Sequence, residues 1–282
     1  MSSQKKNMQY VRLGNSGLKV SRVILGTMSY GSPEWQKWVL DEEEGIKHIK
    51  LAYEMGIQTF DTANAYSNGL SEVVLGKAIK QLNLPRDEIV VMTKVYFQVG
   101  HRINEFTMGG GGPPNEHGLS RKHIFDSIKR SLERLQLDYV DVLQCHRFDY
   151  NTPIAETMQA LHDGGGTGDD AHIENVRSWI DPLVSPSQRI LDSLIGRYGK
   201  AHEGNSEIVR RVESLAKKKN LTMAQVALAW VMSKDQVSAP IVGTTNIKNL
   251  EELIAAVSVK LDDEEIKHLE EPYAPQAIFG HS

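Results

Sequence analysis

Gln58-Thr59-Phe60-Asp61-Thr62-Ala63-Asn64-Ala65-Tyr66 is the stretch that decides the fold. Its β-prone and apolar first residues predict a short buried strand that ends at the carboxylate of Asp61. Tyr66 follows in a polar loop, just before the start of a helix. An acid at the point where a buried strand emerges needs a partner or water, so we expect the rest of the chain to supply partners for Asp61.

The same order of strand and helix repeats on both sides of this stretch. Apolar runs predict further strands over 23–28, 89–95 and 139–146. Apolar residues at helical spacing predict helices over 41–55, 71–82, 124–135 and 153–162. Successive strand–helix units imply parallel strands joined by right-handed crossovers, which means a barrel or a doubly wound sheet.

Two parts of the chain depart from this repeat. Near the start, the turn residues Asn15-Ser16-Gly17 predict a short hairpin that covers one end of the core. After residue 162 the regular pattern stops, and residues 164–206 hold a glycine-rich join and helix-like pieces. The pattern resumes with a helix from Glu207, a helix opened by the capping box of Thr222 and Gln225, a strand over 239–245 and a helix over 249–257. The chain thus has about five core strands, where an eight-fold barrel has eight.

Composition restricts the class of protein. The 282 residues are 40% hydrophobic and 24% charged, which predicts a single globular domain over 1–282. A net charge of −4 and a pI near 6.2 give no general attraction to nucleic acid or anionic lipid. The chain lacks an apolar signal core and a membrane-spanning run, so we expect a cytoplasmic protein. Its single cysteine, Cys145, excludes an internal disulfide, and the histidines show no metal-ligand spacing.

Three residues with chemical potential stand at predicted strand ends, namely Asp61, Lys94 and His146. Ligands of α/β proteins bind at the carboxyl ends of parallel strands, so we expect these side chains to meet there, with Tyr66 reaching over the same end. Strand alternation turns Cys145 away from His146, which favours a packing role over a nucleophilic one.

These residue types suit the reduction of a carbonyl group. A phenol has a reference pKa near 10, and a neighbouring ammonium favours its ionised form, so Lys94 can activate Tyr66. Asp61 can pair with Lys94 and fix it in place. Tyr66 could then give a proton to a carbonyl oxygen as hydride reaches the carbon, while His146 hydrogen-bonds that oxygen.

The chain resembles the aldo-keto reductases, especially fungal members related to the aryl-alcohol dehydrogenase and potassium-channel β-subunit branches. The resemblance covers roughly residues 11–162 and 208–281, and it is carried by Gly26-Thr27-Met28, Phe60 to Tyr66, Met92-Thr93-Lys94, Leu143 to His146 and Ile241 to Thr245. It implies a (β/α)8 barrel, NADPH as hydride donor, and a catalytic tetrad of Asp61, Tyr66, Lys94 and His146. Trp35 and Trp38 would either line a substrate pocket or pack in the core or a lid.

The resemblance also implies the cofactor contacts. Those on the nicotinamide ribose side are Gly26, Thr27, Met28 and Asp61. Those that hold the adenosine 2'-phosphate and adenine are Gly243, Thr244, Thr245, Lys248, Asn249 and Glu252. The second group makes independent sense, because a helix N-terminus after Gly-Thr-Thr offers free N–H groups to an anion and Lys248 adds positive charge.

One large departure separates this chain from the family. Members carry three further strands between positions matching His162 and Glu207, with motifs that hold nicotinamide and pyrophosphate, and these motifs are absent here. We therefore expect an incomplete (β/α)8-type barrel in which residues 164–206 replace part of the structure. Two strand edges would be exposed, which predicts either a helical cover from residues 173–200 or self-association.

Two functions follow from these observations. The first is NADPH-dependent reduction of aldehydes or ketones to alcohols, with Tyr66 as the general acid and no metal. The alternative is a catalytically impaired or inactive truncated reductase that acts, if at all, as a weak nucleotide-binding or interaction protein. Binding of NADPH, and its oxidation in the presence of an aldehyde, separates the two.

Overall fold

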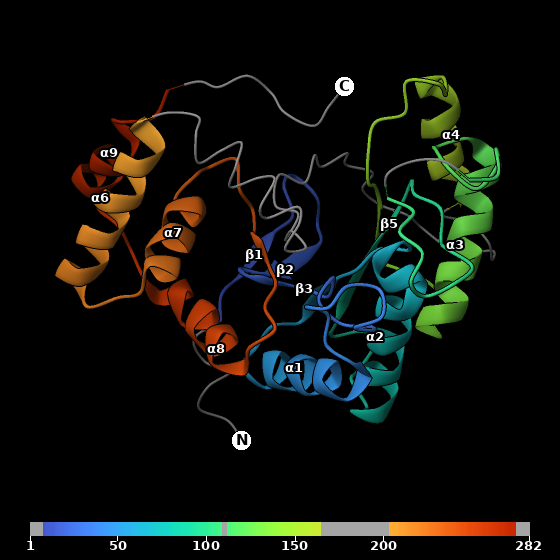
Figure 1. Cartoon of the computed structure of the whole chain (residues 1–282), viewed down its shortest axis with the longest axis horizontal. Helices are drawn as coiled ribbons and strands as arrows, with labels where there is room; N and C mark the ends of the chain where they lie inside the picture. The colour runs from blue at the N-terminus through green and yellow to red at the C-terminus, as the bar shows by residue number, and fades with distance from the viewer. Residues whose placement is uncertain (1–7, 109–111, 165–202, 275–282) are drawn as a thin grey trace. The chain divides into compact units, whose positions relative to one another are not determined.

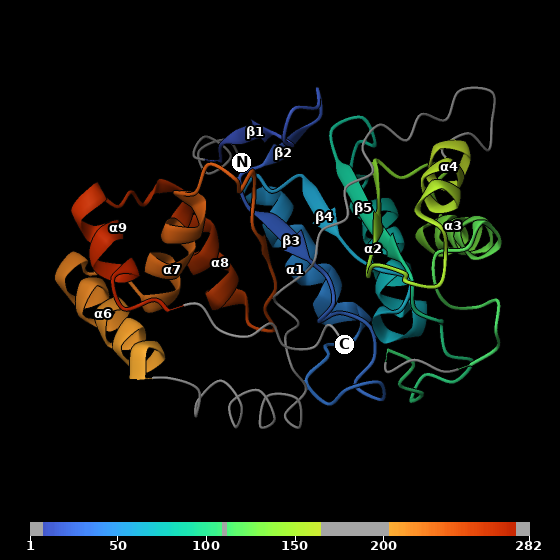
Figure 2. The ribbon, with the colours of Figure 1, turned by 90° about the horizontal axis from the view of Figure 1, so that it is seen from above.

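A five-stranded parallel sheet is the centre of the first part of the chain (Figure 1). The computed structural model describes residues 8–108, 112–164 and 203–274. The sheet has the order β6-β5-β4-β3-β7, and β3, β4 and β5 run side by side in Figure 2. Its strands are β3 (Ile24–Gly26), β4 (Thr59–Asp61), β5 (Val90–Val95), β6 (Val142–Cys145) and β7 (Ile241–Val242). The predicted α/β class with five parallel core strands is confirmed.

A helix follows each of these strands, as the periodicity predicts. These helices are α1 (Glu42–Glu54), α2 (Leu70–Gln81), α3 (Arg121–Leu135), α4 (Ile154–Gly164) and α8 (Ile247–Ala255). The side chains of Asp41 and Ser120 accept hydrogen bonds from the first turns of α1 and α3, which fixes where these helices begin. Helix α8 begins two residues before the predicted position, because Asn246 Oδ1 accepts a hydrogen bond of 2.9 Å from the backbone of Lys248.

A hairpin closes the amino-terminal end of the sheet. Strands β1 (Tyr10–Arg12) and β2 (Lys19–Ser21) pair antiparallel, as the turn residues predict. Leu13 and Val20 of this hairpin pack with the first residues of the sheet strands in one apolar cluster, which also contains Ile24, Val90, Met92 and Val142. This end of the core is therefore filled and apolar, and the polar strand ends lie at the other.

The described residues form two compact units, one of 8–164 with 238–254 and one of 203–237 with 255–274. In the second unit, α6 (Glu203–Lys219), α7 (Met223–Met232) and α9 (Asp263–Glu270) share a small core of Leu215, Ala216, Val226 and Leu269. The capping box that predicts α7 is present, with Thr222 and Gln225 exchanging hydrogen bonds. Helix α6 begins at Glu203, four residues before the predicted start. A 3₁₀ turn, η3 (Ala256–Ser258), lies between α8 and α9.

Parts of the sequence interpretation lie outside the described residues. These are the glycine-rich join beyond residue 164 and the predicted helical cover over 173–200. No helix within residues 8–108, 112–164 or 203–274 is long and apolar enough to span a membrane. The same ranges contain no group of three or more His, Cys, Asp or Glu side chains suited to a metal ion.

Replacement of Gly76 by alanine should destabilise the first unit. A Cβ atom at Gly76 of α2 would stand 2.2 Å from the backbone oxygen of Leu135, so α2 and α3 would have to move apart. Overpacking of this kind costs about 1–3 kcal/mol of unfolding free energy. Urea unfolding followed by circular dichroism measures the loss. Gly17→Ala is the matched control, because no atom lies within 4 Å of the added methyl group. Equal midpoints for the two variants would contradict the close approach of α2 and α3.

Candidate active site

Strand register brings the predicted polar residues together at the carboxyl end of the sheet. Asp61 is the last residue of β4, and Lys94 lies two residues beyond its partner Met92 in β5. Lys94 in turn pairs with Gln144 of β6, and His146 follows directly after that strand. Because side chains alternate along a strand, Asp61, Lys94 and Gln144 share one face.

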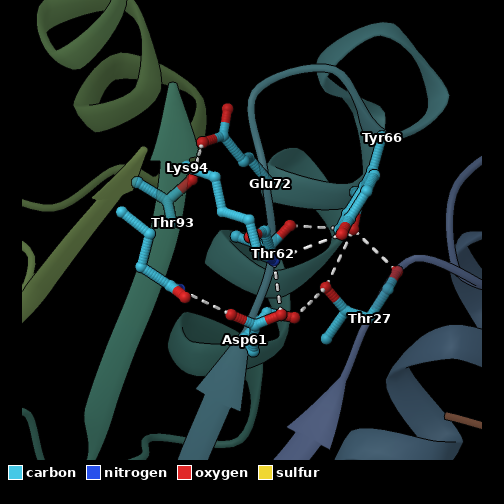
Figure 3. A network of polar contacts seen from close by, with 9 residues as sticks. Thr27, Asp61, Thr62, Tyr66, Glu72, Thr93 and Lys94 are labelled. Carbon is cyan, nitrogen blue, oxygen red and sulfur yellow. Dashed lines mark hydrogen bonds and ion pairs between the residues drawn. The ribbon is translucent and has the colours of Figure 1, made fainter. Parts of the chain in front are cut away.

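The ammonium of Lys94 is the centre of this cluster (Figure 3). It donates hydrogen bonds to Asp61 Oδ2 at 2.6 Å, to the backbone oxygen of Thr62 at 2.8 Å and to the hydroxyl of Tyr66 at 3.2 Å. An ammonium has three N–H groups, so these contacts use all of its donors. Gln144 Nε2 donates to the other oxygen of Asp61 at 2.8 Å.

Both members of this ion pair are buried. Asp61 and Lys94 are each only 3% exposed. Burial alone would lower the pKa of Lys94, but the charge of Asp61 and the contact with Tyr66 outweigh it, and the pKa is raised. Lys94 is therefore a cation at neutral pH. The predicted pairing of Asp61, Lys94 and Tyr66 is thus seen in the geometry.

Tyr66 reaches the ammonium from a tight turn. It begins the 3₁₀ turn η2 (Tyr66–Gly69), which leads directly into α2. Lys94 Nζ lies 4.8 Å from the centroid of the Tyr66 ring, and the ring of His146 meets it edge-on at 5.6 Å. The phenol is buried between a cation and an imidazole, where its hydroxyl has a fixed orientation.

His146 is a buried, neutral imidazole. Burial and the nearby charges of Lys94 and Arg147 hold its pKa well below the ordinary value. Its Nδ1 atom finds no hydrogen-bond partner among the described residues, and its ring also contacts Phe97, with centroids 5.1 Å apart. Buried polar atoms without a partner are uncommon in folded proteins, so His146 Nδ1 calls for an explanation beyond packing.

Two supporting networks escaped the sequence analysis. Ser71 in the first turn of α2 lies 2.9 Å from the hydroxyls of both Thr27 and Thr62, and it donates to the Thr27 backbone oxygen at 2.7 Å. Next to it, the fully buried Glu72 accepts a hydrogen bond of 2.6 Å from Thr93 and pairs with Arg134 of α3 at 2.6 Å. In the sequence, the feature that could have indicated these networks is the adjacent pair Ser71-Glu72 at the start of a predicted helix.

The residues predicted to hold a cofactor lie at two adjoining strand ends. Gly26 ends β3 and Gly243 follows β7, and these strands pair in parallel. A Cβ atom at Gly26 would stand 2.9 Å from Ile241, so glycine permits this approach. Ser29 donates a hydrogen bond of 3.3 Å to the backbone oxygen of Thr244. Beyond it, Thr245, Lys248 and Asn249 are exposed, and Glu252 is partly buried.

The sequence of this chain is similar to proteins of one known family. Residues 22–174 and 181–274 match the model of the Aldo/keto reductase family. A versiconal hemiacetal acetate reductase of Aspergillus parasiticus is 40% identical, over 96% of this chain and 98% of that protein. An aldo-keto reductase of Fusarium vanettenii is 36% identical, over 100% of this chain and 95% of that protein. A Schizosaccharomyces pombe protein provisionally named as an aryl-alcohol dehydrogenase is 38% identical, over 96% of this chain and 97% of that protein.

The lengths of these alignments add a structural fact. They run over 340, 355 and 344 positions, whereas this chain has 282 residues. Each of the three relatives therefore contains residues that have no counterpart here.

The stability of the protein should fall in mild acid partly because of His146. Its pKa is depressed below 6.5 in the folded state, so its contribution to stability is complete above that pH and is lost as the unfolded chain takes up the proton. The loss amounts to at most about 1.4 kcal/mol per pH unit below the unfolded pKa. Urea unfolding of the wild type and of His146→Gln at neutral pH and in mild acid measures it. We expect a smaller acid loss in the variant, and equal losses would contradict the buried neutral state.

Proposed function

This chain belongs to the aldo/keto reductase family, and from that premise we propose that it reduces aldehydes or ketones to alcohols with NADPH. The family and its aryl-alcohol dehydrogenase-like members make the protein an oxidoreductase of carbonyl compounds, and the family generally uses NAD(P)H. The observation that carries the finer proposal is the 3.2 Å contact between the buried ammonium of Lys94 and the hydroxyl of Tyr66.

The residues at the ends of β3 and β7 fit a dinucleotide. Strands β3 and β7 approach closely at Gly26 and Gly243, where a Cβ atom on Gly243 would stand 3.5 Å from the backbone oxygen of Gly26. The exposed side chain of Lys248, in the first turn of α8, supplies positive charge, which suits the 2'-phosphate of NADPH. Thr27, Met28, Thr244, Thr245, Asn249 and Glu252 complete the proposed cofactor residues.

The chain's own side chains would handle the proton. NADPH held by the residues at the ends of β3 and β7 would supply a hydride for the carbonyl carbon. Tyr66 gives its hydroxyl proton to the carbonyl oxygen, and Lys94 stabilises the phenolate that remains. Asp61 and Gln144 hold Lys94 in position. His146 is neutral, so one ring nitrogen can donate a hydrogen bond to the same oxygen without competing for its proton.

A second candidate rests on the shorter chain. The relatives contain residues that this chain lacks, and β6 and β7 each pair with one strand only within the described sheet. A truncated reductase of low activity, which binds nucleotide weakly or associates through its sheet edges, would have the same features. The buried catalytic cluster favours the active enzyme, because an unused ion pair brings a desolvation cost without benefit.

Tyr66→Phe should lower turnover strongly while leaving cofactor binding intact. The change removes one hydroxyl that is the proposed proton donor, and loss of a general acid lowers kcat by about 10²–10⁴-fold. The measurement is NADPH oxidation in the presence of p-nitrobenzaldehyde. Tyr150→Phe is the control, because that side chain is 84% exposed and its hydroxyl lies in solvent. Wild-type turnover in Tyr66→Phe would remove Tyr66 from the mechanism.

A fluorescence titration with NADPH, paired with light scattering, separates the two candidates. Micromolar binding, a preference for NADPH over NADH and aldehyde-dependent oxidation support the reductase. Weak binding without oxidation, together with oligomers in solution, supports the truncated protein. Loss of the preference for NADPH in Lys248→Ala would add support for the proposed phosphate contact.

A further inference from the structure

The turn that follows Tyr66 has an unusual backbone. Ser67, Asn68 and Gly69 have φ angles of 47°, 48° and 90°, so three consecutive residues are left-handed. Such conformations cost about 1 kcal/mol or more for residues other than glycine, and they persist only where the surroundings enforce them. Ser67 is held from one side, because its Oγ lies 3.4 Å from the backbone nitrogen of Ser32 and a Cβ on Gly31 would stand 2.3 Å from it.

Asn68 is held from the other side, by the loop between β5 and α3. Its Nδ2 lies 2.9, 3.2 and 2.7 Å from the backbone oxygens of Arg102, Ile103 and Glu105, which share its two N–H groups. Its Oδ1 accepts a hydrogen bond of 3.0 Å from the backbone nitrogen of Gly100. One amide thus serves four backbone groups of a single loop, and a side chain at Gly100 would collide with it at 2.7 Å.

This loop borders the candidate active site at its base. Phe97, at its start, contacts the ring of His146, and its backbone oxygen accepts a hydrogen bond of 3.1 Å from Asn64. Thr107 closes the loop by donating to the backbone oxygen of Gln98 at 2.7 Å. The half-exposed ring of Phe106 lies 6.3 Å from that of Trp35. The loop therefore runs from His146 to the exposed ring of Phe106, which packs against the buried Trp35.

We propose that Asn68 is a positioning residue that fixes the loop of residues 98–107 against the turn carrying Tyr66. The amide of Asn68 holds the loop at a fixed position relative to Tyr66, the proposed proton donor. A carbonyl substrate that contacts the loop is thereby positioned for Tyr66. The proposal rests on the proposed reductase function. Asn68 would affect substrate binding rather than proton transfer, because its side chain contacts the loop backbone. The contacts of Lys94 with Asp61 and Tyr66 do not involve it.

Two variants and one control test this role. Asn68→Gly keeps the left-handed backbone and removes all four contacts, whereas Asn68→Asp keeps the acceptor for Gly100 and loses the donors. Both should raise KM for p-nitrobenzaldehyde about ten-fold or more, with kcat within about three-fold of wild type and NADPH binding unchanged. Asn83→Gly is the control, because Asn83 is also left-handed, with φ of 49°, and follows α2 on an exposed surface. Its kinetics should equal those of the wild type.

Hydrogen exchange gives a readout that does not depend on turnover. The Gly100 amide should lose protection in Asn68→Gly and keep it in Asn83→Gly. Unchanged KM, or a fall in kcat alone, would overturn the positioning role in an active enzyme. If the wild type oxidises no NADPH with the aldehyde, the reductase proposal fails and Asn68 loses its role in substrate binding. Unchanged protection at Gly100 would separately reject the anchoring of the loop.

Discussion

The buried ion pair of Lys94 and Asp61 is the interaction on which the rest of the structure depends. Removing two charges from water costs several kcal/mol for each ion, and only close geometry with further hydrogen bonds offsets it. Here Lys94 Nζ lies 2.6 Å from Asp61 Oδ2, and its other two N–H groups bind Thr62 and Tyr66. Gln144 donates a hydrogen bond to the second carboxylate oxygen of Asp61. Such geometry requires β4, β5 and β6 in one register. The apolar hairpin end of the sheet supplies hydrophobic burial that helps to stabilise this polar end.

The same pair sets the charge states of its neighbours. Lys94 stays cationic beside the hydroxyl of Tyr66, and His146 stays neutral. In the proposed reaction, these charge states would favour proton release from the phenol and a hydrogen bond from His146 to the carbonyl oxygen. The pKa of Lys94 is raised and that of its neighbour His146 is lowered within the same buried cluster. The lysine has a carboxylate partner that raises its pKa, whereas burial, and then repulsion by Lys94, lowers the pKa of His146.

Much of this could be predicted from the sequence, for physical reasons. Asp61, Lys94 and His146 each end an apolar run, and parallel strands bring their ends together. The contact of Gln144 with Asp61 could not be predicted in this way, because it depends on the register of β5 and β6. Helix α9 was missed although Asp262 and Glu265 form its capping box. Asn68-Gly69 indicates a turn, but four hydrogen bonds to a loop more than thirty residues away leave no local pattern.

The first turn of α2 has a consequence for protein engineering. Ser71 and Glu72 are adjacent, yet one binds the ends of β3 and β4 while the other binds Thr93, the neighbour of Lys94. Arg134 extends this link to α3 at the outside of the sheet. A substitution in α2 or α3 beside Glu72 can thus affect Thr93, the neighbour of Lys94, through one side chain. Mutant libraries that aim to alter the proposed substrate preference should therefore leave the first turn of α2 constant.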